Sequence, residues 1–183
     1  MEKKLSDKVV AIIIADGFEQ SEFEKPLKAL QDEGATVDVI SIKKGKIKGW
    51  KDKNWGDEFE ATKAINEVES GNYDAVVLPG GVMNPDLLRQ NDDVIDFIAD
   101  FLDEGKPVAA ICHGPWTLIE THNLDGRTMT SYPSIKTDLI NAGVKWVDEE
   151  VVVDDGLVTS RNPQDLPAFC KKMVEEIAEG VHH

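Results

Sequence analysis

The sequence is poor in cysteine, histidine and positive charge, and each shortage excludes a class of protein. Two cysteines among 183 residues cannot build the framework of a disulfide-rich secreted domain, so we expect a reducing, cytoplasmic location. The four histidines show no clustering and no His-Glu-x-x-His spacing, and a Cys-x-x-Cys pair is lacking, so we expect no metal site. Lys and Arg number 20 against 35 Asp and Glu, and the formal net charge of −15 argues against nucleic acid and acidic membrane surfaces as partners.

Long apolar runs and nucleotide-binding loops are missing as well. No run approaches the length of a transmembrane helix, and the first residues lack the apolar core of a signal peptide. Neither a Walker loop nor a Gly-x-Gly-x-x-Gly fingerprint follows a predicted strand, so we expect no cofactor. Without a repeat or a long linker, residues 1–183 are predicted to form one domain. Residues 181–183, which include His182 and His183, are interpreted as a disordered tail or a tag remnant.

The apolar segments that are present predict an α/β fold. Residues 9–15 read Val-Val-Ala-Ile-Ile-Ile-Ala, which is typical of a central parallel strand that is buried on both faces. An amphipathic helix pattern follows and ends at Gly34, and a second strand is predicted over residues 36–42. This βαβ opening indicates a doubly wound, mostly parallel sheet with helices on both faces. Trp50 and Trp55 fall in a stretch predicted as a loop, where they suit a local cluster, a binding surface or an oligomer contact.

Residues 107–116, Pro-Val-Ala-Ala-Ile-Cys-His-Gly-Pro-Trp, have the pattern of a nucleophile elbow. An apolar strand runs into Cys112, Gly114 permits a sharp turn, and a helix is predicted to start directly afterwards. The helix N-terminus would favour the thiolate over the thiol. A free cysteine is more often a small buried hydrophobe, but the His-Gly-Pro that follows favours a reactive Cys112.

Two further strand ends supply candidate partners for this thiol. Gly80-Gly81 follows a buried strand, and its N–H groups would either face a developing oxyanion or form a plain tight turn. Glu19 follows the first strand. If Glu19 is protonated, it would donate a hydrogen bond that favours the thiolate; if it is ionised, its charge would repel the thiolate. The alternative is that Glu19 is a solvated surface residue without either effect, as we expect for Glu22 nearby. His113 is interpreted either as a general base or as a solvent-facing helix residue.

Several spaced motifs together resemble one known family. They are Asp-Gly-Phe-Glu at 16–19, Leu-Pro-Gly-Gly at 78–81, Ala-Ile-Cys-His-Gly-Pro at 110–115, Thr-Ser-Tyr-Pro-Ser-Ile-Lys at 130–136, Asn-Ala-Gly-Val-Lys-Trp-Val-Asp at 141–148 and Val-Val-Val-Asp at 151–154. In this order they are similar to the DJ-1/PfpI superfamily, and more to its PfpI-like intracellular protease branch than to DJ-1 itself. The resemblance covers nearly the whole chain and implies one class I glutamine amidotransferase-like domain with a flavodoxin-like three-layer sandwich.

The resemblance also implies roles for particular residues. Cys112 would be the nucleophile, Glu19 the carboxyl partner that touches its sulfur, and the N–H groups of Gly81 and His113 the oxyanion hole. In PfpI-like proteins a Glu shortly after the Gly-Gly orients the His across a subunit interface. Here the matching segment is one residue longer and carries Asp86 in place of that Glu. If Asp86 orients His113, activity requires a homodimer or a higher homo-oligomer.

Three functions follow from this reading. The first is a PfpI-like cysteine hydrolase, linked to stress, that acts on peptide or amide bonds or on glycated protein through a covalent intermediate. The second is a cofactor-free glyoxalase that converts methylglyoxal to lactate. The third is a non-enzymatic oxidant sensor built on Cys112. The substrate or partner is accordingly a small carbonyl compound, a peptide or a protein.

Overall fold

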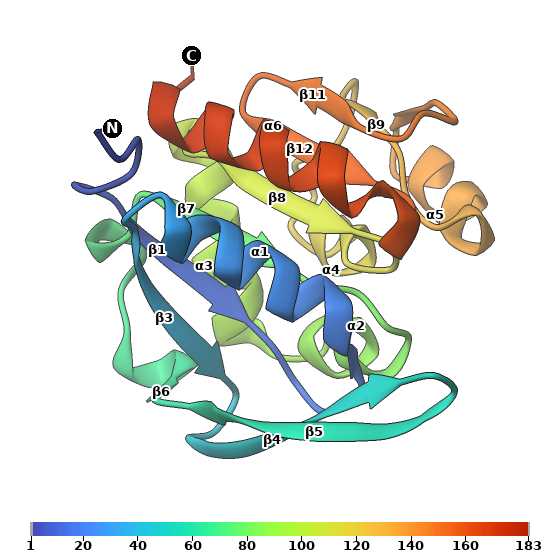
Figure 1. The fold of residues 1–183 in the computed structure, drawn as a ribbon. Coiled ribbons are helices and arrows are strands. Elements are labelled where there is room, and N and C mark those ends of the chain that lie inside the picture. Colours follow the sequence, from blue (N-terminus) through green and yellow to red (C-terminus); the bar gives the residue numbers. More distant parts are fainter. Residues whose placement is uncertain (1, 183) are drawn as a thin grey trace.

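The computed structural model describes residues 2–182 and shows a central sheet between two layers of helices (Figure 1). Seven strands form this sheet in the order β11 (Val152–Asp154), β12 (Leu157–Ser160), β8 (Val108–Ile111), β7 (Ala75–Leu78), β1 (Val9–Ile13), β3 (Thr36–Ser41) and β6 (Lys63–Ala64). All neighbours pair in parallel except β11, which is antiparallel to β12. The predicted α/β class is confirmed.

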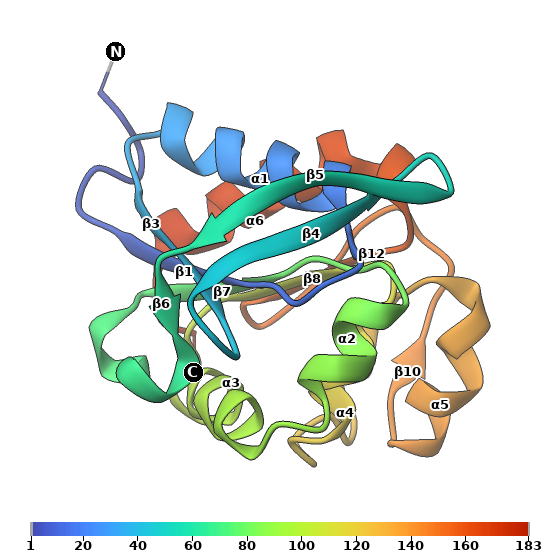
Figure 2. The same ribbon diagram turned by 90° about the horizontal axis from the view of Figure 1, so that it is seen from below.

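Helices cover both faces of the sheet, as the view from below shows (Figure 2). One face carries α1 (Gln20–Asp32) and α6 (Leu166–Glu179). The other carries α2 (Met83–Leu88), α3 (Asp92–Glu104), α4 (Pro115–Ile119) and α5 (Lys136–Asn141). Short 3₁₀ turns lie at Ile65–Glu67, Ser70–Asn72, Pro133–Ile135 and Pro163–Asp165.

The hydrophobic core is divided between the two faces because strand side chains alternate. Along β1, Ala11 and Ile13 pack toward α3, whereas Val10 and Ile12 pack toward α1 and α6. Both faces of each inner strand are therefore buried, which is why these strands read as unbroken apolar runs.

The strand order places a crevice at one edge of the sheet. From β1 the chain winds through β3 to β6 on one side, and from β7 through β8 to β12 on the other. Open α/β sheets bind ligands outside the carboxyl ends of the strands where this winding reverses. The reversal lies between β1 and β7, so the loops after β1, β7 and β8 meet there.

The predicted loop containing the two tryptophans is instead a β-hairpin. It comprises β4 (Gly45–Lys51) and β5 (Asn54–Ala61), and β4 also pairs with β2 (Phe18–Glu19) directly after β1. The Trp50 and Trp55 rings meet edge to face with centroids 5.4 Å apart, which confirms the local cluster. The pairing of Glu19 with Trp50 draws the hairpin to the crevice. A further pair, β9 (Thr128–Met129) and β10 (Lys145–Trp146), lies outside the main sheet.

The predicted tail at 181–183 is described as far as His182. The backbone N–H of His182 donates to the carbonyl oxygen of Gly105 at 2.7 Å, so this part of the tail packs against the end of α3. His183 lies outside the described residues. Among residues 2–182, no helix combines the length and apolar character that crossing a bilayer requires.

Candidate active site at the carboxyl edge of the sheet

Cys112 occupies a tight turn between β8 and α4, as the elbow pattern predicts. Its φ of +64° is uncommon for a residue other than glycine. Two hydrogen bonds hold it there, because its N–H donates to Ser160 O at 3.0 Å and its carbonyl accepts from Tyr132 N–H at 2.8 Å. A Cβ at Gly114 would lie 2.5 Å from Leu78 O, so the turn needs a residue without a side chain at that position.

The carboxyl that lies against the thiol belongs to Glu22, and the prediction for Glu19 is wrong. Glu22 is fully buried, its Oε1 accepts from Gly80 N–H at 2.9 Å, and its carboxyl lies close enough to the Cys112 thiol for each group to shift the pKa of the other. Its second oxygen, Oε2, has no hydrogen-bond partner within residues 2–182. Glu19 is half-buried, lines the cavity above and makes no hydrogen bond with Cys112 within residues 2–182. The prediction that Glu22 is solvated fails for the same reason.

The positions of Glu19 and Glu22 along α1 explain why Glu22, and not Glu19, lies against the thiol. Glu19 is the N-cap residue of α1, whereas Glu22 lies within its first turn. The buried positions of α1 include Phe23, Pro26 and Leu30, and Glu22 is four residues before Pro26 on the same face. A carboxyl on an apolar helix stripe was the sequence signal that could have identified it.

Burial changes the protonation of this carboxyl and of the thiol. Desolvation raises the pKa of Glu22 to about 8, so it carries a proton at neutral pH and can donate to sulfur. Cys112 is only 7% exposed. Burial raises the pKa of the thiol, Glu22 adds to this effect once it ionises at higher pH, and the N–H groups of Gly81 and His113 lower the pKa. The net direction is upward, which contradicts the predicted resting thiolate.

His113 contacts the thiol within the same chain. Its Nδ1 lies 3.3 Å from Cys112 Sγ, and its Nε2 lies 3.1 Å from Ser134 Oγ. The ring stacks on Tyr132 with centroids 4.6 Å apart. Burial lowers the pKa of His113, so the imidazole is neutral at pH 7 and can accept a proton. Ser134 was not singled out by sequence reasoning, because 21 residues separate it from His113.

Backbone N–H groups approach the sulfur from two loops. The N–H groups of Gly81 and His113 lie near enough to the Cys112 sulfur to lower the pKa of the thiol, and they are the pair predicted for an oxyanion hole. Gly81 has a φ of +79°, and a Cβ there would overlap Gly17 O. This close approach explains why glycine stands at the end of β7.

Buried Asn84 fastens the Gly80-Gly81 loop to β1. Its Nδ2 donates to Pro79 O and Gly80 O, both at 3.0 Å, and its Oδ1 accepts from Ala15 N–H at 2.8 Å. These bonds join the carboxyl ends of β7 and β1, which flank the crevice. Sequence reasoning treated this residue only as part of the loop.

A cavity of about 560 Å³ opens above Cys112. Its apolar lining comprises Trp50, Val82, Met83, Tyr132 and Pro163. Asp86 lies exposed on α2 and also lines this cavity. It makes no hydrogen bond with His113 within the chain as described from residue 2 to residue 182.

Comparison with known proteins gives one consistent family. The model of the DJ-1/PfpI family matches residues 8–176. YraA of Bacillus subtilis (strain 168), named as a candidate cysteine protease, is 44% identical over 162 residues, 88% of this chain and 94% of that protein. Protein/nucleic acid deglycase 2 of Escherichia coli (strain K12) is 45% identical over 164 residues, 88% of this chain and 93% of that protein. The crystal structure of Drosophila melanogaster DJ-1beta superposes with a TM-score of 0.85 at 32% identity, covering 93% of this chain and 90% of that one.

Proposed function

The chain belongs to the DJ-1/PfpI family, and we propose that it is a cysteine hydrolase that removes carbonyl adducts from proteins, with Cys112 as its nucleophile. The surroundings of one sulfur atom carry this proposal. The imidazole of His113 lies 3.3 Å from Sγ, and the carboxyl of Glu22 and two backbone N–H groups lie near enough to shift the pKa of the thiol. A nucleophile, a base and oxyanion donors converge at the floor of a cavity, which is the combination that acyl transfer requires.

The first step is addition of the thiol to a substrate carbonyl. His113 Nδ1 takes the thiol proton while sulfur bonds to the carbonyl carbon, and the electron pair of the C=O bond moves to oxygen. The N–H groups of Gly81 and His113 donate to this oxyanion. Protonated Glu22 donates to the sulfur as its charge develops, which offsets the desolvation that keeps the resting thiol neutral.

The substrate for the next step is the adduct in its amide form, an α-hydroxy amide isomeric with the first carbinolamine, in which the leaving nitrogen is bonded to the carbon that sulfur attacks. The tetrahedral intermediate then collapses. The bond from carbon to the leaving nitrogen breaks, and His113 returns its proton to that nitrogen. Water attacks the thioester, which releases the acid and restores the thiol. Ser134, hydrogen-bonded to the far side of the imidazole, holds the ring in place during both transfers.

The shape of the cavity favours small carbonyl groups over folded polypeptide. Cys112 is 7% exposed at the base of about 560 Å³, and the apolar side chains of Trp50, Met83 and Tyr132 narrow the approach. A glyoxal-derived group on the end of a Lys, Arg or Cys side chain can reach such a sulfur. A peptide bond can reach it only if the polypeptide that contains it is unfolded at that point. The name of the deglycase relative in E. coli supports the same substrate class.

Asp86 retains its proposed role in a homo-oligomer. Its exposed side chain lies on α2 at the wall of the cavity, where a second copy of the chain could approach. In a homodimer, Asp86 of one copy would take the place of Ser134 Oγ beside the imidazole Nε2 of the other, since Nδ1 faces Cys112. We then expect Asp86→Asn to lose activity and, in sedimentation over a range of concentrations, to assemble less than the wild-type chain.

Three substrates distinguish this function from its alternatives. The chain and its Cys112→Ala variant are incubated with a methylglyoxal-treated peptide, with casein and with free methylglyoxal. We expect the wild-type chain alone to regenerate the unmodified peptide. Casein cleavage without repair of the peptide would indicate a peptidase instead, and lactate from free methylglyoxal alone would indicate a glyoxalase. No turnover, together with selective peroxide oxidation of Cys112, would indicate a sensor.

A further inference from the structure

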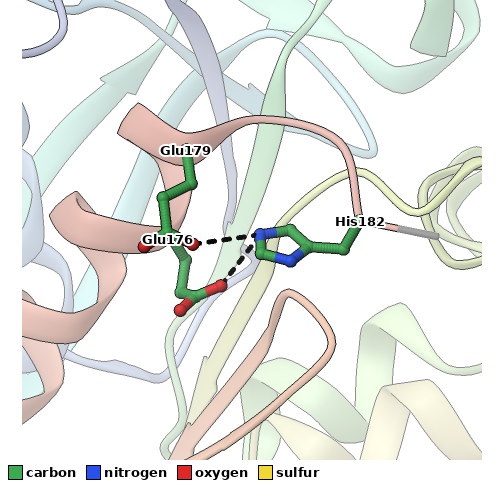
Figure 3. Close-up of side chains that lie close together, drawn as sticks. All are labelled: Glu176, Glu179 and His182. Atoms are coloured by element: carbon green, nitrogen blue, oxygen red, sulfur yellow. Dashed lines mark ion pairs between the residues drawn. The ribbon is translucent and has the colours of Figure 1, made fainter.

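The C-terminal end of α6 brings two carboxylates and an imidazole together, away from Cys112. Glu176 and Glu179 are one helical turn apart, and His182 folds back toward both (Figure 3). His182 Nε2 lies 2.9 Å from Glu176 Oε2 and 3.8 Å from Glu179 Oε2. One ligand atom from each residue falls within 4.8 Å of the others.

The nearest two of these atoms, Glu176 Oε2 and His182 Nε2, approach as an ion pair but without hydrogen-bond geometry. Glu176 is 8% exposed, and neither its Oε2 nor His182 Nε2 has a hydrogen-bond partner within residues 2–182, although the two atoms are 2.9 Å apart. The ring N–H or lone pair of Nε2 and the lone pairs of the carboxylate oxygen therefore do not point at each other. Buried polar atoms without partners are uncommon and call for a ligand or another explanation.

Two glycines make room for His182 in this position. The His182 N–H donates to Gly105 O at 2.7 Å, and a Cβ on Gly105, which has a φ of +71°, would overlap the His182 carbonyl. A Cβ on Gly156, in the turn between β11 and β12, would lie 3.1 Å from the His182 ring. The imidazole is thus held by elements from three parts of the chain.

We propose that Glu176, Glu179 and His182 bind a divalent transition-metal ion, for which zinc is the natural probe. Carboxylate oxygens and imidazole nitrogen bind Zn²⁺ at about 2.0–2.2 Å, and three protein ligands leave a fourth position for water. Donors on a tetrahedron of that size lie about 3.3 Å apart, between the two separations found here. Two carboxylates neutralise the charge of the ion.

The site is separate from the candidate active site. Gly105 precedes β8 and Cys112 follows it, so the two sites lie at opposite ends of this strand. The ion would join the end of α6 to the end of α3 and to the β11–β12 turn, and would act on stability rather than on catalysis. Bound metal should therefore raise the melting temperature of the chain without being needed for turnover.

Zinc titration of the full chain by calorimetry tests the proposal. We expect one Zn²⁺ per chain, at least about tenfold weaker binding in His182→Ala and in Glu176→Gln, and unchanged binding in His183→Ala and in Cys112→Ala. Co²⁺ should give the visible absorption of a tetrahedral site in the wild-type chain and in neither of the two ligand variants.

Two results would overturn the proposal. One is zinc affinity that is insensitive to both ligand substitutions. The other is an equal loss of affinity in His183→Ala, which would mean that the terminal histidines bind metal as a free tail. Should Glu176→Gln fail to fold, Glu179→Gln provides the second carboxylate variant, because this side chain is 64% exposed. It must also weaken zinc binding, with an unchanged melting temperature in EDTA.

Discussion

Replacing Glu22 with Gln should remove a loss of stability that the wild-type chain suffers as the pH rises from 5 to 8. The fully buried carboxyl of Glu22 has its pKa raised from 4.5 to about 8. Below pH 4.5 it is protonated in both the folded and the unfolded state and contributes no pH dependence. As the pH rises, the carboxyl ionises first in the unfolded state, and this ionisation stabilises the unfolded state relative to the folded state until the folded carboxyl also ionises near pH 8. A raised carboxyl pKa therefore lowers stability with increasing pH.

The size of the effect follows from the two pKa values. Each pKa unit corresponds to about 1.36 kcal/mol. The free energy of unfolding should fall by roughly 3 kcal/mol between pH 5 and pH 7.5, and by about 5 kcal/mol in total once the pH exceeds 8. Gln can keep the contact of Glu22 Oε1 with Gly80 N–H and present an N–H group to the sulfur, so the fold should persist in the variant.

Urea unfolding at several pH values between 5 and 7.5 measures this difference. The stability advantage of Glu22→Gln over the wild-type chain should grow by about 3 kcal/mol across that range. Glu19→Gln is the matched control, because Glu19 is half-buried and does not contact the thiol. Burial also raises the pKa of Glu19, but because this side chain is only half-buried, the advantage of Glu19→Gln over the wild type should grow with pH much less than that of Glu22→Gln. Parallel profiles for wild type and Glu22→Gln would refute a protonated Glu22 beside the sulfur.

Three further substitutions test the surrounding site. Gly81→Ala should lower kcat by about 100-fold or more with an unchanged circular dichroism spectrum, because it displaces an oxyanion donor; wild-type kcat would remove Gly81 from the mechanism. Asn84→Ala should lower the free energy of unfolding in urea by about 3 kcal/mol, since it leaves the N–H of Ala15 after β1 and the carbonyl of Pro79 after β7 without this partner, and a loss below about 1 kcal/mol would contradict this. Ser134→Ala should lower kcat/KM about fivefold, the equivalent of one neutral hydrogen bond, and should alter its pH profile by releasing His113; an unchanged profile would show that the contact does not position the ring.

The sequence predicted those features that depend on the backbone conformation of a few neighbouring residues. The apolar runs predicted the parallel strands, and the small residues around Cys112 predicted the elbow, because a sharp turn after a strand limits the residue types that fit. The close backbone approach at Gly80-Gly81 could be predicted for the same reason. These features depend on neighbours within a few positions, so composition and spacing suffice to find them.

Contacts between residues that are far apart in the sequence could not be predicted in this way. Ninety positions separate Glu22 from Cys112, and the choice between Glu19 and Glu22 depends on which face of α1 packs against the sheet. The hairpin that carries Trp50 was interpreted as a loop, since its strands are mostly polar and exposed and lack the apolar alternation of a half-buried strand. His182 was assigned to a tail, although it packs onto α3 and a β-turn.

What the sequence determined was the backbone geometry at Cys112, because that geometry is set by residues next to it. What only the tertiary structure decided was the chemistry of the thiol. Packing buries one carboxyl rather than its neighbour, and this burial keeps the acid protonated and the sulfur neutral at rest. Local sequence specifies where a side chain is presented, but its pKa depends on the solvent and charges that the assembled fold removes or supplies.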